Sequence, residues 1–282
     1  MIALDKKLDH ILRAALREDV GGRDLTSSMI DADLTARGDV VFKSRGVLCG
    51  LSVAERIYRL VDENLRFLPV AKDGELIEPG RAIFYLEGSA RSILTGERTA
   101  LNFLSEMSGV ATLTRQFVEK VKNTKVAIYD TRKTLPNFRA LDRYSVRVGG
   151  GHNHRRGLYD GVLFKENHWT ALAGTDMVFV IKRARARYPR NVPIGVEVRS
   201  LDELRALVKS AADFILLDNF DLPAARQAVR IRNDSGSAIP LEISGGVTLD
   251  TVEAYAATGV ERISVGALTH SAKPPDLSLN LL

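Results

Sequence analysis

From residue 126 onward, short apolar runs alternate with amphipathic stretches. Six runs hold a residue that can carry chemistry at or near their carboxyl end: VAIYD (126–130), GVLFK (161–165), GVEV (195–198, holding Glu197), FILLD (214–218), LEIS (241–244) and RISVG (262–266). Helical patterns lie between the later runs, at 201–210, 223–232 and 248–258. This alternation is typical of β-α units, which place parallel strands in one sheet. The pattern predicts about six barrel strands rather than eight, and therefore an incomplete barrel.

The first hundred residues mix short strands and helices. Strands are expected at 39–43 and 47–49, and Ser52 with Glu55 predicts a capping box that opens a helix ending near residue 61. Further short strands end near residue 86. A helical face predicts a helix over 92–107, which Ser108-Gly109 is expected to interrupt before a second helix over 112–122.

The N-terminal segment has an apolar helical face, formed by Leu4, Leu8, Ile11, Leu12 and Ala15. Charged residues at 5, 6, 7 and 9 interrupt any signal-peptide core, and no apolar run approaches the ~20 residues of a membrane span. We therefore expect a cytoplasmic protein with no membrane partner.

Composition fits a globular protein, with 45% hydrophobic and 27% charged residues among 282. The net charge of +5 comes without a long Lys/Arg block, which favours one basic pocket over nucleic-acid binding. Cys49 is the single cysteine, so an internal disulfide and a cysteine metal cluster are excluded.

Polar side chains stand at the carboxyl ends of the predicted strands. Arg132 and Lys133 follow the first run, Lys165 ends the second, and Glu197 and Asp218 belong to the next two. In α/β barrels such residues meet at one mouth, which is where the active site lies. The pattern indicates an enzyme that acts on a very anionic substrate.

A glycine-rich segment over 149–157 adds two more candidates. His154 can donate a hydrogen bond and Arg155 offers a planar fork, which together suit an anionic aromatic acid. His152 and His154 form an H-x-H pair, but no third histidine or cysteine ligand lies nearby, which disfavours zinc. Arg156 is interpreted as a surface charge.

Glycine turns follow the last two strands, at Ser244-Gly245-Gly246 and Gly266-Ala267. Exposed backbone N–H groups at such turns bind phosphate, and the final loops of barrels often do so. Glu197 and Asp218 can hold Mg²⁺, bind ribose hydroxyls, stabilise a developing positive charge, or simply form salt bridges with the nearby cations.

The residues alone leave two other functions open. Lys165 at a strand end also suits a Schiff-base lyase or aldolase. A non-catalytic protein that binds a phosphosugar or a nucleic acid through its positive charge is the other alternative.

Longer motifs resemble the quinolinate phosphoribosyltransferase family. They are DTRKT (130–134), GGGHNHR (149–155), LFKENH (163–168), LLDN (216–219), EISGG (242–246) and SVGALTHS (264–271), with ERTALNFL (97–104) and REDVGGRDLTS (17–27) earlier in the chain. The resemblance implies an α/β fold with an N-terminal α/β sandwich over 1–108 and a partly open six-stranded α/β barrel over 109–269. The tail, 270–282, would return to the first domain.

The same resemblance implies phosphoribosyl transfer from phosphoribosyl pyrophosphate to quinolinate with decarboxylation, which gives nicotinate mononucleotide for NAD synthesis. It implies a homodimer, or an assembly of dimers, in which one subunit's first domain caps the partner's barrel. It also implies Mg²⁺, with Glu197 and Asp218 as tentative ligands. Nicotinate is the alternative substrate, although the cations around His154 and Arg155 favour two carboxylates.

Residue roles carry over from the family motifs. Quinolinate would be held by Arg98 of the partner subunit and by Arg132, His154, Arg155 and Lys165. Phosphoribosyl pyrophosphate would be held by Lys133, Glu197, Asp218, Ser244, Gly245 and Gly266. Lys165, Glu197 and Asp218 would be catalytic. His152 departs from the family pattern, which more often has a small polar residue there.

Overall fold

The computed structural model describes residues 5–282 and divides them into two compact units. The first unit contains the chain up to Arg115, together with Leu135–Gly150 and Ala272–Leu282, and the second contains Gln116–Thr134 and Gly151–Ser271. Leu4, expected on the apolar face of the first helix, lies outside the described residues.

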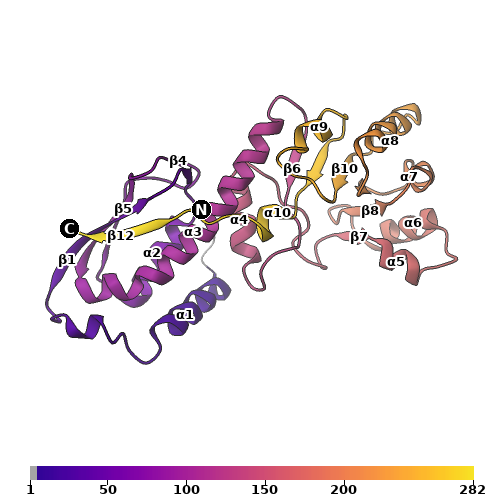
Figure 1. The fold of residues 1–282 in the computed structure, drawn as a ribbon. Helices are drawn as coiled ribbons and strands as arrows, with labels where there is room; N and C mark the ends of the chain where they lie inside the picture. The colour runs from indigo at the N-terminus through magenta and orange to yellow at the C-terminus, as the bar shows by residue number, and fades with distance from the viewer. Residues whose placement is uncertain (1–4) are drawn as a thin grey trace. The chain divides into compact units, whose positions relative to one another are not determined.

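The first unit is built on a four-stranded antiparallel sheet (Figure 1). Its strand order is β12 (Leu277–Leu281), β1 (Thr35–Phe42), β5 (Ala82–Ser89) and β3 (Arg66–Pro69). A second sheet pairs β2 (Gly46–Val47) with β4 (Leu76–Ile77).

Helices supply the rest of this unit's core. They are α1 (Lys6–Val20), α2 (Leu51–Val61), α3 (Ala90–Val121) and α4 (Arg139–Val148), with a short 3-10 helix, η1 (Ser27–Met29). Leu12, Tyr58, Phe84 and Leu101 come from three helices and one strand, and all four are buried in the same apolar cluster. Sheet and helices therefore share one core, as in a two-layer α/β sandwich.

The predicted capping box at the start of α2 is wrong. The helix is preceded by Gly50, and the carboxylate of Asp73 accepts hydrogen bonds from the backbone N–H groups of Gly50 and Leu51, both at 3.1 Å. The Ser52 hydroxyl is buried without a hydrogen-bond partner in the described part of the chain. A carboxylate 22 residues away in sequence thus satisfies the helix end, which a local motif could not indicate.

The predicted break at Ser108-Gly109 is also wrong, because α3 is continuous from Ala90 to Val121. The Ser108 hydroxyl accepts from the Cys49 backbone N–H at 3.0 Å and donates to the Cys49 carbonyl at 3.2 Å. A side chain at Gly109 would bring its Cβ within 2.8 Å of the Lys273 carbonyl oxygen. Ser108 and Gly109 are thus the residues at which other segments pack closely against α3, and these contacts offset the low helix propensity of serine and glycine.

The second unit contains a six-stranded sheet whose neighbouring strands are all parallel. The order is β6 (Ala127–Tyr129), β11 (Arg262–Ser264), β10 (Leu241–Ser244), β9 (Phe214–Asp218), β8 (Ile194–Val198) and β7 (Val162–Phe164). Within residues 5–282, the end strands β6 and β7 do not pair with each other. The predicted fold class, a sandwich domain plus a partly open six-stranded α/β barrel, is confirmed.

Helices follow the strands along the chain, as β-α units require (Figure 1). They are α5 (Glu166–Ala171), α6 (Met177–Arg187), α7 (Leu201–Leu207), α8 (Leu222–Asp234), α9 (Val252–Ala256) and α10 (Ala267–His270). Three of them fall within or around the predicted helices, although α9 is shorter than expected. No helix in residues 5–282 is long and apolar enough to cross a membrane.

Helix propensity alone predicts that alanine at position 109 stabilises the protein, whereas the close contact at Gly109 predicts the opposite. Gly109→Ala should lower the free energy of unfolding by about 1–3 kcal/mol, because its Cβ must displace the Lys273 backbone. Asn102→Ala, at an exposed position of the same helix, is the matched control and should leave stability equal or slightly higher. Urea unfolding at fixed protein concentration measures both, and a Gly109→Ala variant as stable as the control would contradict the close contact.

Candidate active site

A cavity of about 670 Å³ opens at the carboxyl ends of the barrel strands, entirely within the second unit. Most of the residues singled out in the sequence line it: Arg132, Lys133, His154, Arg155, Lys165, Asp218, Ser244, Gly245 and Gly266. Arg132 and Lys165 thus face the same space, although they are 33 positions apart in sequence. Parallel topology accounts for this, because all strands end at one mouth.

Asp130 joins the two loops that carry the arginines. Its buried carboxylate accepts from the Asn153 side-chain amide at 2.6 Å and from the His154 backbone N–H at 2.7 Å. Arg132 follows Asp130 by two positions, and Arg155 follows His154 directly. A charge-assisted bond to the backbone fixes one loop against the other. Asp130 is thus a positioning residue that the sequence indicated only as a strand end.

Arg132 and Arg155 form the cationic wall of the cavity, with His154 beside Arg155. The His154 Nδ1 accepts from the Arg155 backbone N–H at 2.8 Å, which assigns the ring hydrogen to Nε2. The Arg155 guanidinium donates to the Gly161 carbonyl at 3.1 Å. Burial, and then the neighbouring Arg132 charge, lower the pKa of Arg155. Two guanidinium groups that repel one another are suited to an anionic ligand, which would relieve that repulsion.

Lys165 is held by an ion pair. Its Nζ lies 2.6 Å from Oε2 of Glu197, which is buried on β8. Glu197 is not among the residues that line the cavity, but its carboxylate lies close enough to the cavity residue Asp218 to raise the pKa of that group. The Lys165 amine is thus engaged by a carboxylate, as suits a group that meets an anion, whereas the Schiff-base alternative needs a free amine to attack a carbonyl carbon.

Asp218 lies at the end of β9 and lines the cavity beside this pair. Burial raises its pKa, and the negative charge of Glu197 raises it further. The Asn219 side-chain amide donates to Asp218 at 3.1 Å. Two neighbouring carboxylates suit Mg²⁺, which commonly binds one or two protein carboxylates and completes its shell with substrate oxygens and water. In residues 5–282, no group of three or more His, Cys, Asp or Glu residues is arranged for a metal.

The glycine turn after β10 has a conformation that other residues rarely adopt. Gly245 and Gly246 have φ angles of +99° and +62°, and a Cβ at Gly245 would lie 2.1 Å from the Asn219 side-chain oxygen. Asn219 itself donates its backbone N–H to the Ser244 carbonyl at 2.8 Å. The turn leaves room for a phosphate against the backbone.

The turn at Gly266 lies against the loop that carries Lys133. Gly266 precedes α10, which is only four residues long. The Thr269 hydroxyl of this helix donates to the Lys133 carbonyl at 2.7 Å. This turn therefore contributes local N–H groups and a fixed Lys133 backbone rather than the dipole of a long helix.

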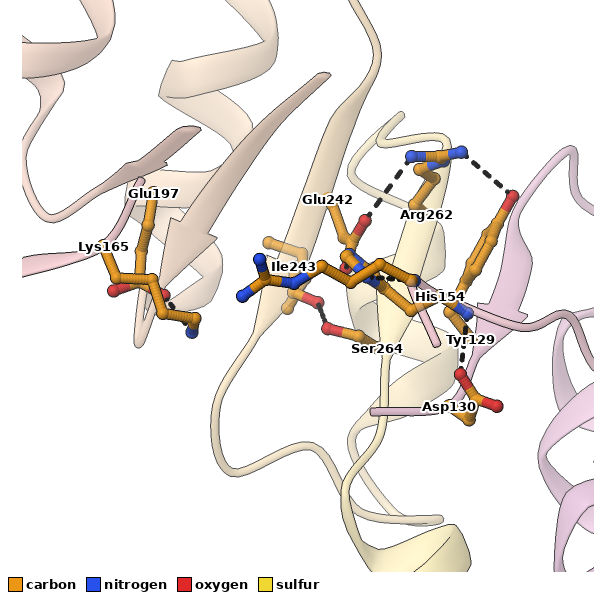
Figure 2. A network of polar contacts seen from close by, with 10 residues as sticks. Tyr129, Asp130, His154, Lys165, Glu197, Glu242, Ile243, Arg262 and Ser264 are labelled. Atoms are coloured by element: carbon orange, nitrogen blue, oxygen red, sulfur yellow. Dashed lines mark hydrogen bonds and ion pairs between the residues drawn. The ribbon is translucent and has the colours of Figure 1, made fainter. Parts of the chain in front are cut away.

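Glu242, on β10, is a cavity residue that the sequence analysis did not single out. Its side chain is fully buried, with Oε1 3.6 Å from His154 Nε2 and Oε2 3.7 Å from Arg262 Nη1. Figure 2 shows Arg262 between Glu242 and Tyr129. Burial raises the pKa of Glu242 to about 7, and the Arg262 charge offsets part of that rise. A glutamate in the middle of the apolar run LEIS was the available signal.

Arg98 lies in the first unit, on α3, with an exposed side chain whose guanidinium is 3.9 Å from Glu97. His152 stacks against Tyr129 with ring centroids 5.3 Å apart and is not part of the cavity lining. Neither residue contributes to the cavity of the second unit described here.

An incomplete α/β barrel with a cavity lined by cationic side chains at its strand ends defines the class of this protein. Residues 24–108 match the N-terminal domain of quinolinate phosphoribosyl transferase, and residues 110–280 match its C-terminal domain. The chain belongs to the quinolinate phosphoribosyltransferase family.

Individual relatives agree with this assignment. A Mycobacterium leprae protein named nicotinate-nucleotide pyrophosphorylase [carboxylating] is 41% identical, with 96% of this chain and 95% of that protein covered. A Bacillus subtilis protein, named as a probable enzyme of the same kind, is 38% identical over 99% of this chain and 94% of its own. The solved nicotinate-nucleotide pyrophosphorylase from Francisella tularensis superposes with a TM-score of 0.92 at 36% identity, covering 98% and 96% of the two chains.

The raised pKa of Glu242 predicts a pH-dependent effect on stability. The folded state binds this proton more tightly than the unfolded state, so protonation of Glu242 stabilises the fold. This stabilisation is complete below pH 4.5 and is lost as pH rises to about 7. Glu242→Gln has no carboxyl to ionise, so its stability lacks this loss at high pH. The free energy of unfolding of the variant minus that of wild type should therefore be about 2–3 kcal/mol higher at pH 8 than at about pH 5.

Urea unfolding at both pH values, at equal protein concentration, measures this difference. Glu253→Gln, at an exposed position on α9, is the control, and its difference from wild type in free energy of unfolding should be the same at both pH values. If the difference between Glu242→Gln and wild type does not change with pH, the pKa of the Glu242 carboxyl is not raised by burial and the prediction is wrong.

Proposed function

We propose that this chain transfers the phosphoribosyl group of phosphoribosyl pyrophosphate to quinolinate, releasing pyrophosphate and CO₂ and forming nicotinate mononucleotide for NAD synthesis. The names of the Mycobacterium leprae and Bacillus subtilis relatives support this reaction. The observation that carries it is the convergence of Arg132, Arg155 and Lys165 with a glycine turn in one cavity. Both substrates are anions that repel each other in water, and such a pocket offsets that repulsion.

Quinolinate is the ligand that the cationic wall fits. It carries two carboxylates on adjacent ring carbons, and guanidinium forks bind carboxylates with two parallel hydrogen bonds. We assign Arg132 and Arg155 to these carboxylates, with the Nε2–H of His154 and the ammonium of Lys165 beside them. Nicotinate has one carboxylate and would leave part of this charge uncompensated.

Phosphoribosyl pyrophosphate is assigned to the opposite part of the cavity. The backbone around Ser244, Gly245 and Gly266 would hold the 5′-phosphate, and Lys133 would meet the pyrophosphate. Asp218 and Glu197 would face the ribose, where their carboxylates can bind hydroxyls.

The reaction follows from these positions. The C1–oxygen bond breaks with its electron pair leaving on pyrophosphate, and positive charge develops on the ribose, which Asp218 and Glu197 stabilise. The pyridine nitrogen then forms its bond to C1 with its lone pair. The cationic ring weakens the bond to the adjacent carboxylate, CO₂ departs, and the electron pair stays on the ring carbon until a proton from solvent replaces it. Lys165 stabilises that carbanion.

We also propose that the enzyme uses Mg²⁺. Asp218 and Glu197 would hold the ion, as their adjacent carboxylates and the raised pKa of Asp218 suggest. The ion supplies charge neutralisation on the pyrophosphate.

We propose a homodimer, or an assembly of dimers, in which Arg98 of one subunit completes the quinolinate site of its partner. No nucleic acid or membrane is needed for this activity, and the cytoplasmic location expected from the sequence stays a prediction.

The activity is tested with purified protein, quinolinate, phosphoribosyl pyrophosphate and Mg²⁺. Nicotinate mononucleotide and pyrophosphate should form in equal amounts. Chelation should abolish turnover and added Mg²⁺ should restore it. Nicotinate in place of quinolinate should support little or no product. Failure to form the mononucleotide from quinolinate under these conditions would refute the proposed function.

A mixing experiment tests the shared site. Arg132→Ala and Arg98→Ala should each lower kcat/KM by about 10²–10³-fold, because each removes a group that holds the anion. Refolded together, the two variants should recover about a quarter of wild-type activity, since half of the dimers then contain one intact site.

Arg132→Ala mixed with Arg155→Ala is the matched control. Both residues line the cavity of their own subunit's barrel, so every cavity in a mixed dimer lacks one of them. No intact site can form, and activity should stay low. Equal recovery in both mixtures, or full activity of Arg98→Ala alone, would refute the shared site.

A further inference from the structure

Glu242 occupies the middle of the barrel sheet. In the strand register it is paired with Leu216 on one side and Arg262 on the other, and Leu216 is paired in turn with Glu197. Register partners point to the same face of a sheet. Glu242 therefore faces the interior in one row with Glu197 and Arg262, and it lines the cavity.

The groups facing this carboxyl come from every surrounding element. Arg262 on β11 and His154 on the loop before β7 are the closest, at 3.7 and 3.6 Å, and Asp130 and Lys165 act on it at longer range. The Ser264 hydroxyl on β11 donates to the Ile243 carbonyl at 3.3 Å (Figure 2), and the same side chain lowers the pKa of Glu242. In the described part of the chain, neither oxygen of Glu242 has a hydrogen-bond partner.

Arg262 is itself held away from a closer approach. Its guanidinium lies over the rings of Tyr129 and Phe214, 4.6 and 4.8 Å from their centroids, and donates to the Tyr129 hydroxyl at 3.2 Å. A carboxylate without hydrogen bonds in such a place is costly, and a neutral carboxylic acid costs much less.

The ligand adds charge of the same sign. On the proposed function, a dicarboxylate binds His154 and Arg155, and His154 is the residue that faces Oε1 of Glu242. An ionised Glu242 would then repel the ligand and compete with it for the Nε2–H of His154. Protonation of Glu242 removes both effects.

We propose that Glu242 is a positioning residue that takes up one proton from solvent when the dicarboxylate binds, and so leaves the His154 Nε2–H to the ligand. This inference rests on the proposed function, because it assumes that a dianion occupies the cavity. The binding affinity for that dianion then depends on pH through Glu242: it is highest where the carboxyl is already protonated and falls as pH rises, by up to about tenfold per pH unit.

Calorimetric titration of the full-length protein with quinolinate tests this between about pH 6 and 8.5, where both ligand carboxylates are ionised. Repeating each titration in two buffers of different ionisation heat gives the number of protons taken up. Wild type should take up close to one proton at pH 8 and little at pH 6. Glu242→Gln should take up none, match wild-type affinity at pH 6, and bind about tenfold more tightly than wild type at pH 8.

Glu253→Gln is the control and should behave as wild type. An equal proton uptake in Glu242→Gln, which would assign the proton to another group such as His154, overturns the inference. A loss of affinity in that variant at all pH values overturns it as well, because Glu242 would then be an ordinary structural contact. Both results leave the proposed function in place, whereas no quinolinate binding by wild type refutes the function and the inference together.

The wild-type protein provides a second measurement if the glutamine variant does not fold. The infrared difference spectrum at pH 8 should gain a protonated carboxyl band when quinolinate is added. No such band, or no proton uptake by wild type, overturns the inference.

Discussion

The structure depends on cationic groups that are brought together in one cavity. Arg132, Arg155 and Lys165 face one cavity, and like charges at such short range repel. The fold compensates with acids placed behind them: Glu197 pairs with Lys165, and Asp130 fixes the two arginine-bearing loops. Protein groups therefore hold the cations of the cavity in place, which is the condition for stabilising charge that develops during reaction.

The parallel sheet makes this arrangement possible. Six strands end at one mouth, so residues from distant parts of the chain share one space. Register decides which side chains point to the barrel interior, and Glu197, Glu242 and Arg262 do so as one row. Gly245 completes the cavity, because a side chain there would displace Asn219 from beside Asp218.

Much of this site could be predicted from the sequence because its signals are local. Most candidates lie at or directly after the carboxyl end of an apolar run, and a position at a strand end fixes the mouth at which a side chain lies. Glu242 lies within its run, between Leu241 and Ile243, and a glutamate inside an apolar run is a weaker signal than a polar residue at the end of one. Its meaning depends on His154 and Arg262, which local pattern does not place beside it.

The sequence by itself determined the alternation of strands and helices, the partly open barrel and the family, since these follow from periodicity and from residues at fixed offsets. Only tertiary structure decided that α3 continues through Gly109, that Asp73 rather than Ser52 satisfies the start of α2, and that β12 pairs with β1. In each case a contact between residues far apart in sequence outweighs a weak local preference, because a satisfied backbone group or a close approach is worth more than about 1 kcal/mol of propensity.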